Sequence, residues 1–190
     1  MFNDLKSALR PAFALSIAFV LLLGLAYPLA LTGIGQAAFP SQANGSLIVE
    51  NSKVIGSSLI GQGFASDRYF HGRPSAAGKG YDASASSGSN LAPTSQALAD
   101  RVKADIAAAP PSPGSSVPAD LVTTSASGLD PDLSPEAAFY QVDRVAKVRG
   151  LTPAAIRAIV EAHVERSIVG DAHVNVLALN RALDRTTARP

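Results

Sequence analysis

Cysteine is missing from this 190-residue chain. Its absence excludes disulfide bonds, thiolate metal ligands and a cysteine nucleophile, and it is compatible with either side of a membrane. Clusters of basic residues are missing as well: the formal net charge is +1, and lysine and arginine are spread thinly along the chain. Because nucleic-acid binding depends on concentrated positive charge, we expect no nucleic-acid partner.

The residue arrangements that support metal binding or nucleophilic catalysis are also missing. The three histidines, His71, His163 and His173, are too scattered for the spacings that metal ligands use. Ser125 and Ser127 lie outside a Gly-x-Ser-x-Gly elbow, and no base can be identified from spacing. We therefore predict no catalytic residue and no metal site, and we interpret the two serines as turn-forming hydroxyls.

Two glycine patterns and one pair of acids resemble functional motifs, but each fails on its context. Residues 33–38 match a relaxed dinucleotide fingerprint, yet they follow a long apolar run rather than a strand. Residues 72–80 resemble a phosphate loop with one residue too many between its glycines, and Gly80 stands where a Ser or Thr should bind Mg²⁺. Asp130 and Asp132 flank a proline, which favours a turn over an acid/base pair. We expect this chain to bind no cofactor itself.

One long hydrophobic run lies near the N-terminus. Residues 11–31 carry no charge and are apolar on every helical face. A helix needs about 20 residues to cross a hydrocarbon core about 30 Å thick, so this run predicts a single transmembrane helix. Gly24 and Pro28 interrupt the run, either because a neighbouring helix packs closely there or simply as a small residue and a local bend.

The distribution of positive charge predicts how this helix is oriented. Lys6 and Arg10 precede it with only Asp4 opposing them, whereas Lys53 is the first basic residue that follows it. By the positive-inside rule, residues 1–10 lie in the cytoplasm and the rest of the chain lies outside. A cleaved signal peptide is the alternative, but its apolar region is usually only about 7–15 residues long, so we favour a retained anchor.

The chain after the anchor predicts one domain with mixed secondary structure. Residues 32–46 are rich in Gly, Ala, Gln and Asn and predict a juxtamembrane linker, whereas residues 47–190 have the usual length of a single domain. Residues 47–49 and 53–60 are rich in β-branched side chains around a polar turn, which predicts a β-hairpin. Because two strands alone are marginally stable, helices must cover one of their faces.

Capping residues and apolar periodicity predict the helices of this domain. The expected helices cover residues 93–108, residues 134–150 and residues 153–170, the last with Gly170 as its stop signal. Apolar residues between 174 and 183 predict a short strand-like entry and a final helical turn or two. The sequence thus predicts an α+β fold: one transmembrane helix, then a domain with a β-hairpin or small sheet and several helices.

The least ordinary part of the sequence lies between the hairpin and the first expected helix. Residues 67–75 combine aromatic side chains with arginine and histidine, and residues 76–90 are rich in Gly and Ser. The second stretch has too little apolar surface to offset the entropy of ordering, which favours a flexible loop. The first suits docking onto a partner, where aromatic and Arg side chains dominate contact energy. The alternative is that its residues merely pin the loops onto their own domain.

Several of these stretches together resemble the KdpC family, the small subunits of the bacterial high-affinity potassium-transporting P-type ATPases. The resemblance covers nearly the whole chain, in that family's order. It rests on the single N-terminal span and on residues 69–75, 87–91, 118–131, 149–151 and 174–177. The residues that it marks as a partner or structural motif are Tyr69, Phe70, His71, Gly72, Arg73, Pro74, Ser75, Asn90, Thr123, Thr124, Ser125, Ser127, Gly128, Asp130 and Pro131.

The resemblance implies a non-catalytic accessory subunit in the cell inner membrane, with a periplasmic domain. Its expected partners are a channel-like potassium-selective subunit (KdpA), the P-type ATPase subunit (KdpB), the small peptide KdpF and membrane lipid, while the complex uses ATP, Mg²⁺ and K⁺. The roles that it suggests are stabilising the assembly, supporting coupling between subunits, gating ion entry and raising ATP affinity. A periplasmic domain cannot touch cytoplasmic ATP, so the last role would have to be conformational.

Two other functions remain as alternatives at this stage. The chain could be an independent envelope protein that binds nucleotides, or a secreted domain released by signal cleavage.

Overall fold

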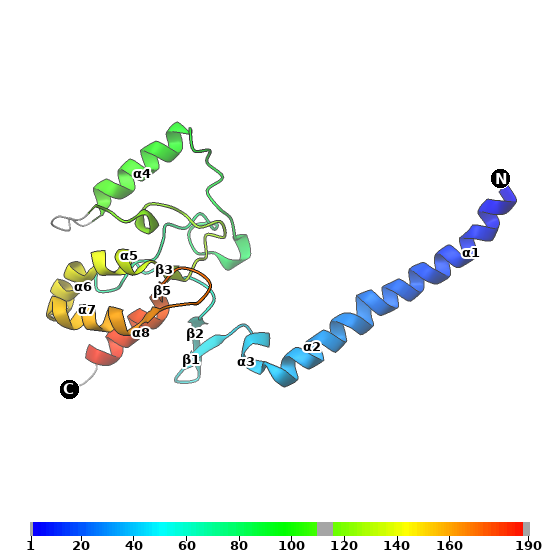
Figure 1. The fold of residues 1–190 in the computed structure, drawn as a ribbon, viewed down its shortest axis with the longest axis horizontal. Helices are drawn as coiled ribbons and strands as arrows, with labels where there is room; N and C mark the ends of the chain where they lie inside the picture. Colours follow the sequence, from blue (N-terminus) through cyan, green and yellow to red (C-terminus); the bar gives the residue numbers. More distant parts are fainter. Residues whose placement is uncertain (1, 110–115, 188–190) are drawn as a thin grey trace. The chain divides into compact units, whose positions relative to one another are not determined.

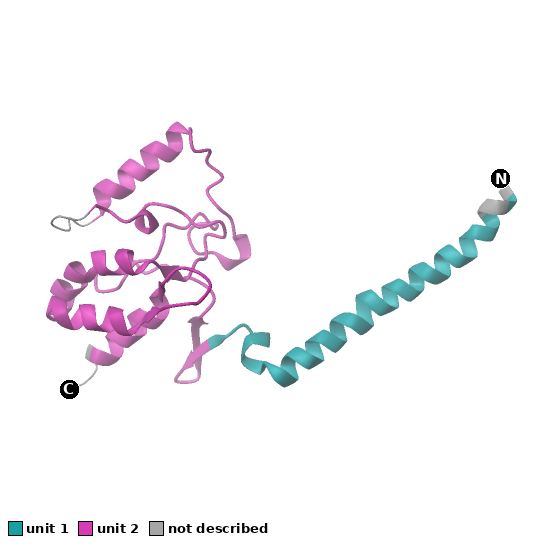
Figure 2. Cartoon of the chain, in the orientation of Figure 1, with its two compact units in different colours: residues 1–47 teal, residues 48–190 magenta. Residues whose placement is uncertain are grey.

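The computed structural model describes residues 2–109 and 116–187, and the chain divides into two compact units (Figure 2). The first unit is Met1–Leu47 and the second is Ile48–Pro190. Figure 1 shows the first as a long helix and the second as a small domain of helices, short strands and irregular loops. The predicted α+β class is confirmed.

The first unit is one continuous helical segment followed by a short helix. Helix α1 (Phe2–Phe19) continues through the π-helix η1 (Val20–Ala26) into α2 (Tyr27–Ala38), and α3 (Pro40–Ala43) follows. Among the described residues, Lys6–Ala38 is the one helix that is long and apolar enough to cross a membrane, by length and composition. The helix therefore continues past residue 31, into the stretch expected to be a linker.

The π-helix has a local cause in the sequence. Pro28 has no backbone N–H and cannot donate to the carbonyl of Gly24 four residues earlier. Immediately before it, the Tyr27 N–H donates to Leu22 O, five residues back, instead of four. Proline and single-turn π-bulges are both recognised causes of irregularity in long helices.

The second unit begins with the predicted hairpin. Strands β1 (Leu47–Glu50) and β2 (Lys53–Ser57) pair in a two-stranded sheet. The residues between them, Asn51 and Ser52, have φ angles of 49° and 63°, as a two-residue type I′ turn requires. β2 ends at Ser57 rather than at residue 60.

A long irregular segment follows, interrupted by short helices. It contains the 3₁₀ helices η2 (Ala83–Ala85) and η3 (Ala119–Leu121) and the helix α4 (Gln96–Ala108). α4 begins three residues later than predicted, because Pro93 lies in a turn before the N-cap residue Ser95. No residue of α4 is fully buried.

The C-terminal part of the domain contains the packed elements. They are β3 (Asp132–Leu133), α5 (Pro135–Tyr140), α6 (Val142–Arg149), α7 (Pro153–Ala162), β4 (Val164–Glu165), β5 (His173–Asn175) and α8 (Val176–Thr187). The three strands form an antiparallel sheet in the order β3-β5-β4, with Leu133 and Val164 each opposite Val174. The apolar residues that recur along these helices and strands are the ones buried in the core. Its fully buried members include Phe70, Val142, Val145, Ile156, Val160, Val174, Leu179 and Leu183.

Two helix predictions need correction. The expected helix over residues 134–150 is divided at Gln141, whose side-chain amide donates to Ala137 O in place of the regular backbone bond. The helix that begins at Pro153 ends at Ala162, not at Gly170, because Val164 and Glu165 become extended to pair with β5. The closing segment is also longer than expected, since α8 has 12 residues.

Candidate functional site

Arg73 joins the two segments that carry most of the motif residues. Its Nη1 atom lies 3.1 Å from Asp130 Oδ2 and 3.8 Å from Asp120 Oδ1. The same guanidinium donates from Nε to Thr123 O (3.3 Å) and from Nη2 to Thr123 Oγ1 (3.2 Å). A planar guanidinium suits such a fork of acceptors, and Arg73 thereby connects residues 57 positions apart in sequence.

Ser75 forms a second junction between the same segments. Its hydroxyl donates to Gly128 O (2.6 Å) and accepts from the backbone N–H groups of Ala77 (3.2 Å) and Tyr81 (2.8 Å). The Tyr81 hydroxyl donates to Arg73 O (2.6 Å), and burial raises the pKa of this phenol, with the Asp130 carboxylate adding to the effect. Tyr81 is therefore bonded through its backbone to Ser75 and through its hydroxyl to Arg73, which closes the loop between residues 73 and 81.

The turn from Ser125 to Asp130 is stabilised by its own side chains. The Ser125 hydroxyl accepts from Gly128 N (2.9 Å), the Ser127 hydroxyl from Leu129 N (3.1 Å), and Asp130 Oδ1 from Asp132 N (3.1 Å). This is the turn-forming role predicted for these residues. The turn also orders the Gly/Ser-rich stretch, since Ser127 O accepts from Ser87 N (3.0 Å).

Two buried amides that local sequence patterns do not predict hold the backbone at Phe70 and His71. Asn180 Oδ1 accepts from Phe70 N (2.8 Å) and its Nδ2 donates to Phe70 O (2.9 Å). Gln141 makes the same pair of bonds to His71: its Oε1 accepts from His71 N (2.8 Å) and its Nε2 donates to His71 O (3.0 Å). Both amides are at most 2% exposed. They replace the partner strand that this segment lacks, and they let the Phe70 ring enter the core.

Tyr69 is held on the other side of this segment. Its hydroxyl donates to Asp184 Oδ2 (3.0 Å), while the Arg149 guanidinium lies 5.1 Å from the ring centroid. Arg149, whose side chain has no exposed area, also bonds Asp184 (2.9 Å) and Arg68 O (2.7 Å). Burial and the Asp184 hydrogen bond raise the pKa of the Tyr69 phenol.

The remaining motif residues take less central positions. Gly72 and Pro74 line a cavity of about 240 Å³ together with His71, and Pro131 O accepts from Val176 N (2.9 Å). Thr124 is half-buried. Asn90 is exposed, has a φ angle of 51°, and lies outside the hydrogen-bonded cluster among the described residues.

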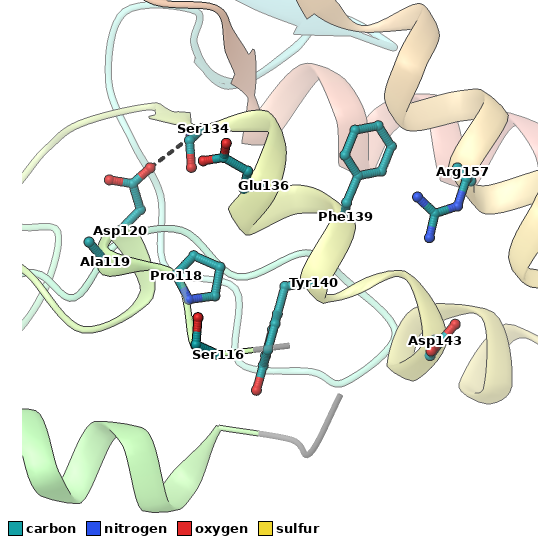
Figure 3. A pocket seen from close by; sticks show the side chains of 10 residues that line it. All are labelled: Ser116, Pro118, Ala119, Asp120, Ser134, Glu136, Phe139, Tyr140, Asp143 and Arg157. Carbon is teal, nitrogen blue, oxygen red and sulfur yellow. Dashed lines mark hydrogen bonds between the residues drawn. The ribbon is translucent and has the colours of Figure 1, made fainter. Parts of the chain in front are cut away.

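A larger cavity of about 710 Å³ lies next to this cluster (Figure 3). Phe139 and Tyr140 of α5 both line it, with side chains that point in opposite directions in Figure 3, and the Arg157 guanidinium of α7 lies 5.1 Å from the Phe139 centroid. Asp120 lines this cavity and also lies beside Arg73, whose Nη1 is 3.8 Å from Asp120 Oδ1. Its Oδ2 accepts a hydrogen bond from Ser134 N (2.8 Å). The other residues that line the cavity are Ser116, Pro118, Ala119, Glu136 and Asp143.

The arrangement serves as a scaffold for the loops of the domain. Within residues 2–109 and 116–187, His, Asp and Glu side chains form no group of three that could hold a metal ion. The side chains of Tyr69, Arg73, Ser75 and Asp130 are engaged with other parts of their own domain. Partner docking by these residues stays a prediction, and the structure shows their second role, the pinning of loops.

The comparison with known families covers both units of the chain. Residues 9–185 match the family model KdpC, described as the K⁺-transporting ATPase, c chain. The chain belongs to the KdpC family. The motif residues and the N-terminal helix from residue 9 onward lie inside the matched range.

Curated KdpC relatives match over nearly their full length. A protein of Caulobacter vibrioides (strain NA1000 / CB15N) is 58% identical over 183 residues, covering 94% of this chain and 93% of that protein. A protein of Bradyrhizobium diazoefficiens is 52% identical over 197 aligned residues, with coverage of 95% and 98%. A third, from Methylobacterium nodulans, is 53% identical with the same coverage. Each is named potassium-transporting ATPase KdpC subunit.

Proposed function

We propose that this chain is a non-catalytic accessory subunit of an ATP-driven potassium uptake pump, and that it works by contact rather than by chemistry. The observation that carries the proposal is the match to the K⁺-transporting ATPase c chain over residues 9–185. The geometry supports it, because the polar side chains of Arg73 and Ser75 fix loops of their own domain.

In this proposal the N-terminal helix anchors the subunit and the domain lies outside the cytoplasm. Lys6 and Arg10 precede the apolar part of the helix, which favours a cytoplasmic N-terminus. ATP and Mg²⁺ would then be bound by the pump subunit, and K⁺ by the potassium-selective subunit. Any influence of this chain on ATP affinity or ion entry would pass through the shape of the assembly.

The test is removal of this chain from the complete pump. We expect lower recovery of the remaining subunits after purification in detergent and loss of potassium-stimulated ATPase activity. Unchanged recovery and unchanged activity would contradict the proposal. Orientation is tested separately by protease treatment of intact cells, which should cleave the domain only once the outer membrane is permeable.

A further inference from the structure

One side of the helical segment from α5 into α6 forms the floor of the larger cavity. Glu136, Phe139, Tyr140 and Asp143 follow the spacing i, i+3, i+4 and i+7, which places their backbone positions on one side of a helix. All four line the cavity of about 710 Å³, and Figure 3 shows η3 on one side of them and Arg157 of α7 on the other. We call these four residues the α5 groove.

The α5 groove carries negative charge that its own domain does not neutralise. Three carboxylates line the cavity, those of Asp120, Glu136 and Asp143, but only one guanidinium does, that of Arg157. Asp120 already lies 3.8 Å from Arg73. By contrast, Glu136 and Asp143 make no hydrogen bond or ion pair with any other residue that the structure describes. Two carboxylates at this cavity are therefore left without a cation.

The surface between these two carboxylates is apolar. Phe139 of α5 is half-buried and lies in the same row as the acids, and Pro118 and Ala119 line the cavity from η3. Lysine and arginine side chains pack their aliphatic stems on such surfaces while the charged head reaches a carboxylate. The cavity has the size of a typical ligand site, so it accommodates more than one side chain.

We infer that the α5 groove receives a basic segment of another subunit of the same pump, with a lysine or arginine paired to Glu136 or Asp143. The inference rests on the proposed function and names a contact surface and a partner chemistry for it. Ion pairs of this kind at the rim of a contact add little affinity in a free pair of proteins. They suffice in an anchored subunit, because tethering beside the partner supplies a high effective concentration.

The charge of the α5 groove argues against the other occupants. Anionic lipid headgroups attract basic surfaces and are repelled by an acidic one. A symmetric dimer of this chain brings the same surface of both copies together, so the Glu136 and Asp143 carboxylates would face each other. A positively charged protein segment meets neither obstacle.

Neutralising the two acids tests the inference in the complete pump. The groove variant is Glu136→Gln/Asp143→Asn, and the matched control is Glu165→Gln/Asp171→Asn, which changes the net charge equally at exposed positions. In about 0.1 M salt, we expect recovery of the other subunits through a tag on this chain to fall at least about threefold for the groove variant only. In about 0.5 M salt the difference should largely disappear, because salt also screens the attraction in the unsubstituted pump. Equal recovery in low salt would overturn the inference.

A variant that keeps both charges separates docking from helix stability. Glu136 and Asp143 each lie in the first turn of a helix, where a negative charge is favourable. Glu136→Asp/Asp143→Glu retains that charge, so we expect it to recover the pump as well as the unsubstituted chain does. A loss as large as that of the groove variant would assign the acids a purely structural role and overturn the inference.

Site-specific photo-crosslinking identifies the occupant directly. A photoreactive phenylalanine analogue is placed at position 139 and, as a control, at Val148 of α6, which is 53% exposed. We expect position 139 to crosslink another pump subunit at least about fivefold more than position 148, within a peptide that contains lysine or arginine. Crosslinks only to lipid, only to a second copy, or at the level of position 148 would overturn the inference.

These outcomes are distinct from a failure of the proposed function. If the groove variant and its control recover the pump equally well, the inference fails and the proposed function stands. If the unsubstituted chain co-purifies with no pump subunit, the proposed function itself fails.

Discussion

Two regions of the domain keep their shape by different means. Residues 132–187 pack apolar side chains of helices and strands into one core, which contains Ile156, Val174 and Leu179 at 0% exposure. In the described part of residues 60–131, helix α4 and two 3₁₀ helices are the regular elements, and the loops around them are held by single polar groups such as Arg73 and Ser75. An apolar core spreads its stabilisation over many contacts, whereas the loop region depends on a few positions that have no substitute. The predictions below test this difference.

The largest effect is expected from a pair of glycines with the same backbone conformation. Gly128 and Gly150 both have a φ angle of 66°, which disfavours any other residue. A Cβ atom at Gly128 would lie 2.6 Å from Ser87 O and 2.7 Å from Ala77 N, whereas nothing lies within 4 Å at Gly150. Gly150→Ala should cost about 1–2 kcal/mol of unfolding free energy, and Gly128→Ala about 2 kcal/mol more because two loops must separate.

Urea unfolding of the full chain in detergent measures both glycine variants. Equal destabilisation would show that the loops move apart freely, and the contrast between the two regions would then be lost.

The next effect concerns the buried amide of Asn180. Asn180→Leu keeps the branched shape of the side chain but leaves Phe70 N and O without their partner inside the domain. Unpaired buried polar groups cost about 1–3 kcal/mol each, so we expect a loss of about 3 kcal/mol. Gln96→Leu, on the surface of α4, is the control and should change stability by less than about 0.5 kcal/mol. A near-neutral Asn180→Leu would mean that the amide is not needed to hold the segment.

A smaller effect is expected at the ion pair that joins the loops. Arg73→Ala or Asp130→Ala removes a partly exposed pair with supporting hydrogen bonds, for about 1–2 kcal/mol. Arg166→Ala breaks a fully surface pair with Glu161 and should cost under about 1 kcal/mol. In the assembled pump, all three variants should retain ATP hydrolysis. Complete loss of turnover in an intact Arg73→Ala complex would instead place Arg73 in the reaction.

The elements that the sequence predicts well are those defined by neighbours in the chain. Ser134 and Thr152 cap their helices through Ala137 N and Ala155 N, and Gly150 ends α6, as predicted from local patterns. The apolar repeat around Leu179 and Leu183 likewise reports burial directly.

The elements that the sequence does not predict depend on distant partners. The end of α7 is set by the pairing of Glu165 with His173, and no nearby residue in the sequence predicts that pairing. Gln141 and Asn180 resemble surface amides in sequence, since their partners are backbone groups 70 and 110 residues away. For Tyr69 and Phe70 the sequence leaves docking and loop pinning open, and the structure shows the second, because the Phe70 ring is buried and the Tyr69 hydroxyl bonds Asp184.

The smallest expected effect is a change in the pH dependence of stability, and it comes from His71 in the loop region. Burial, with help from the Arg144 guanidinium, lowers the pKa of His71 below its ordinary value. The unfolded chain then binds a proton more readily than the folded chain, so this contribution is complete above about pH 6.5 and is lost as pH falls from there to the folded pKa. His71→Gln keeps a donor for Ser66 O and cannot titrate. Between pH 7.5 and 5.5, the thermal midpoint of the full chain should therefore fall less in His71→Gln than in the unsubstituted protein. An equal fall would show that the loop segment around His71 is open to water, and that the amides do not enclose it as tightly as the core encloses its own side chains.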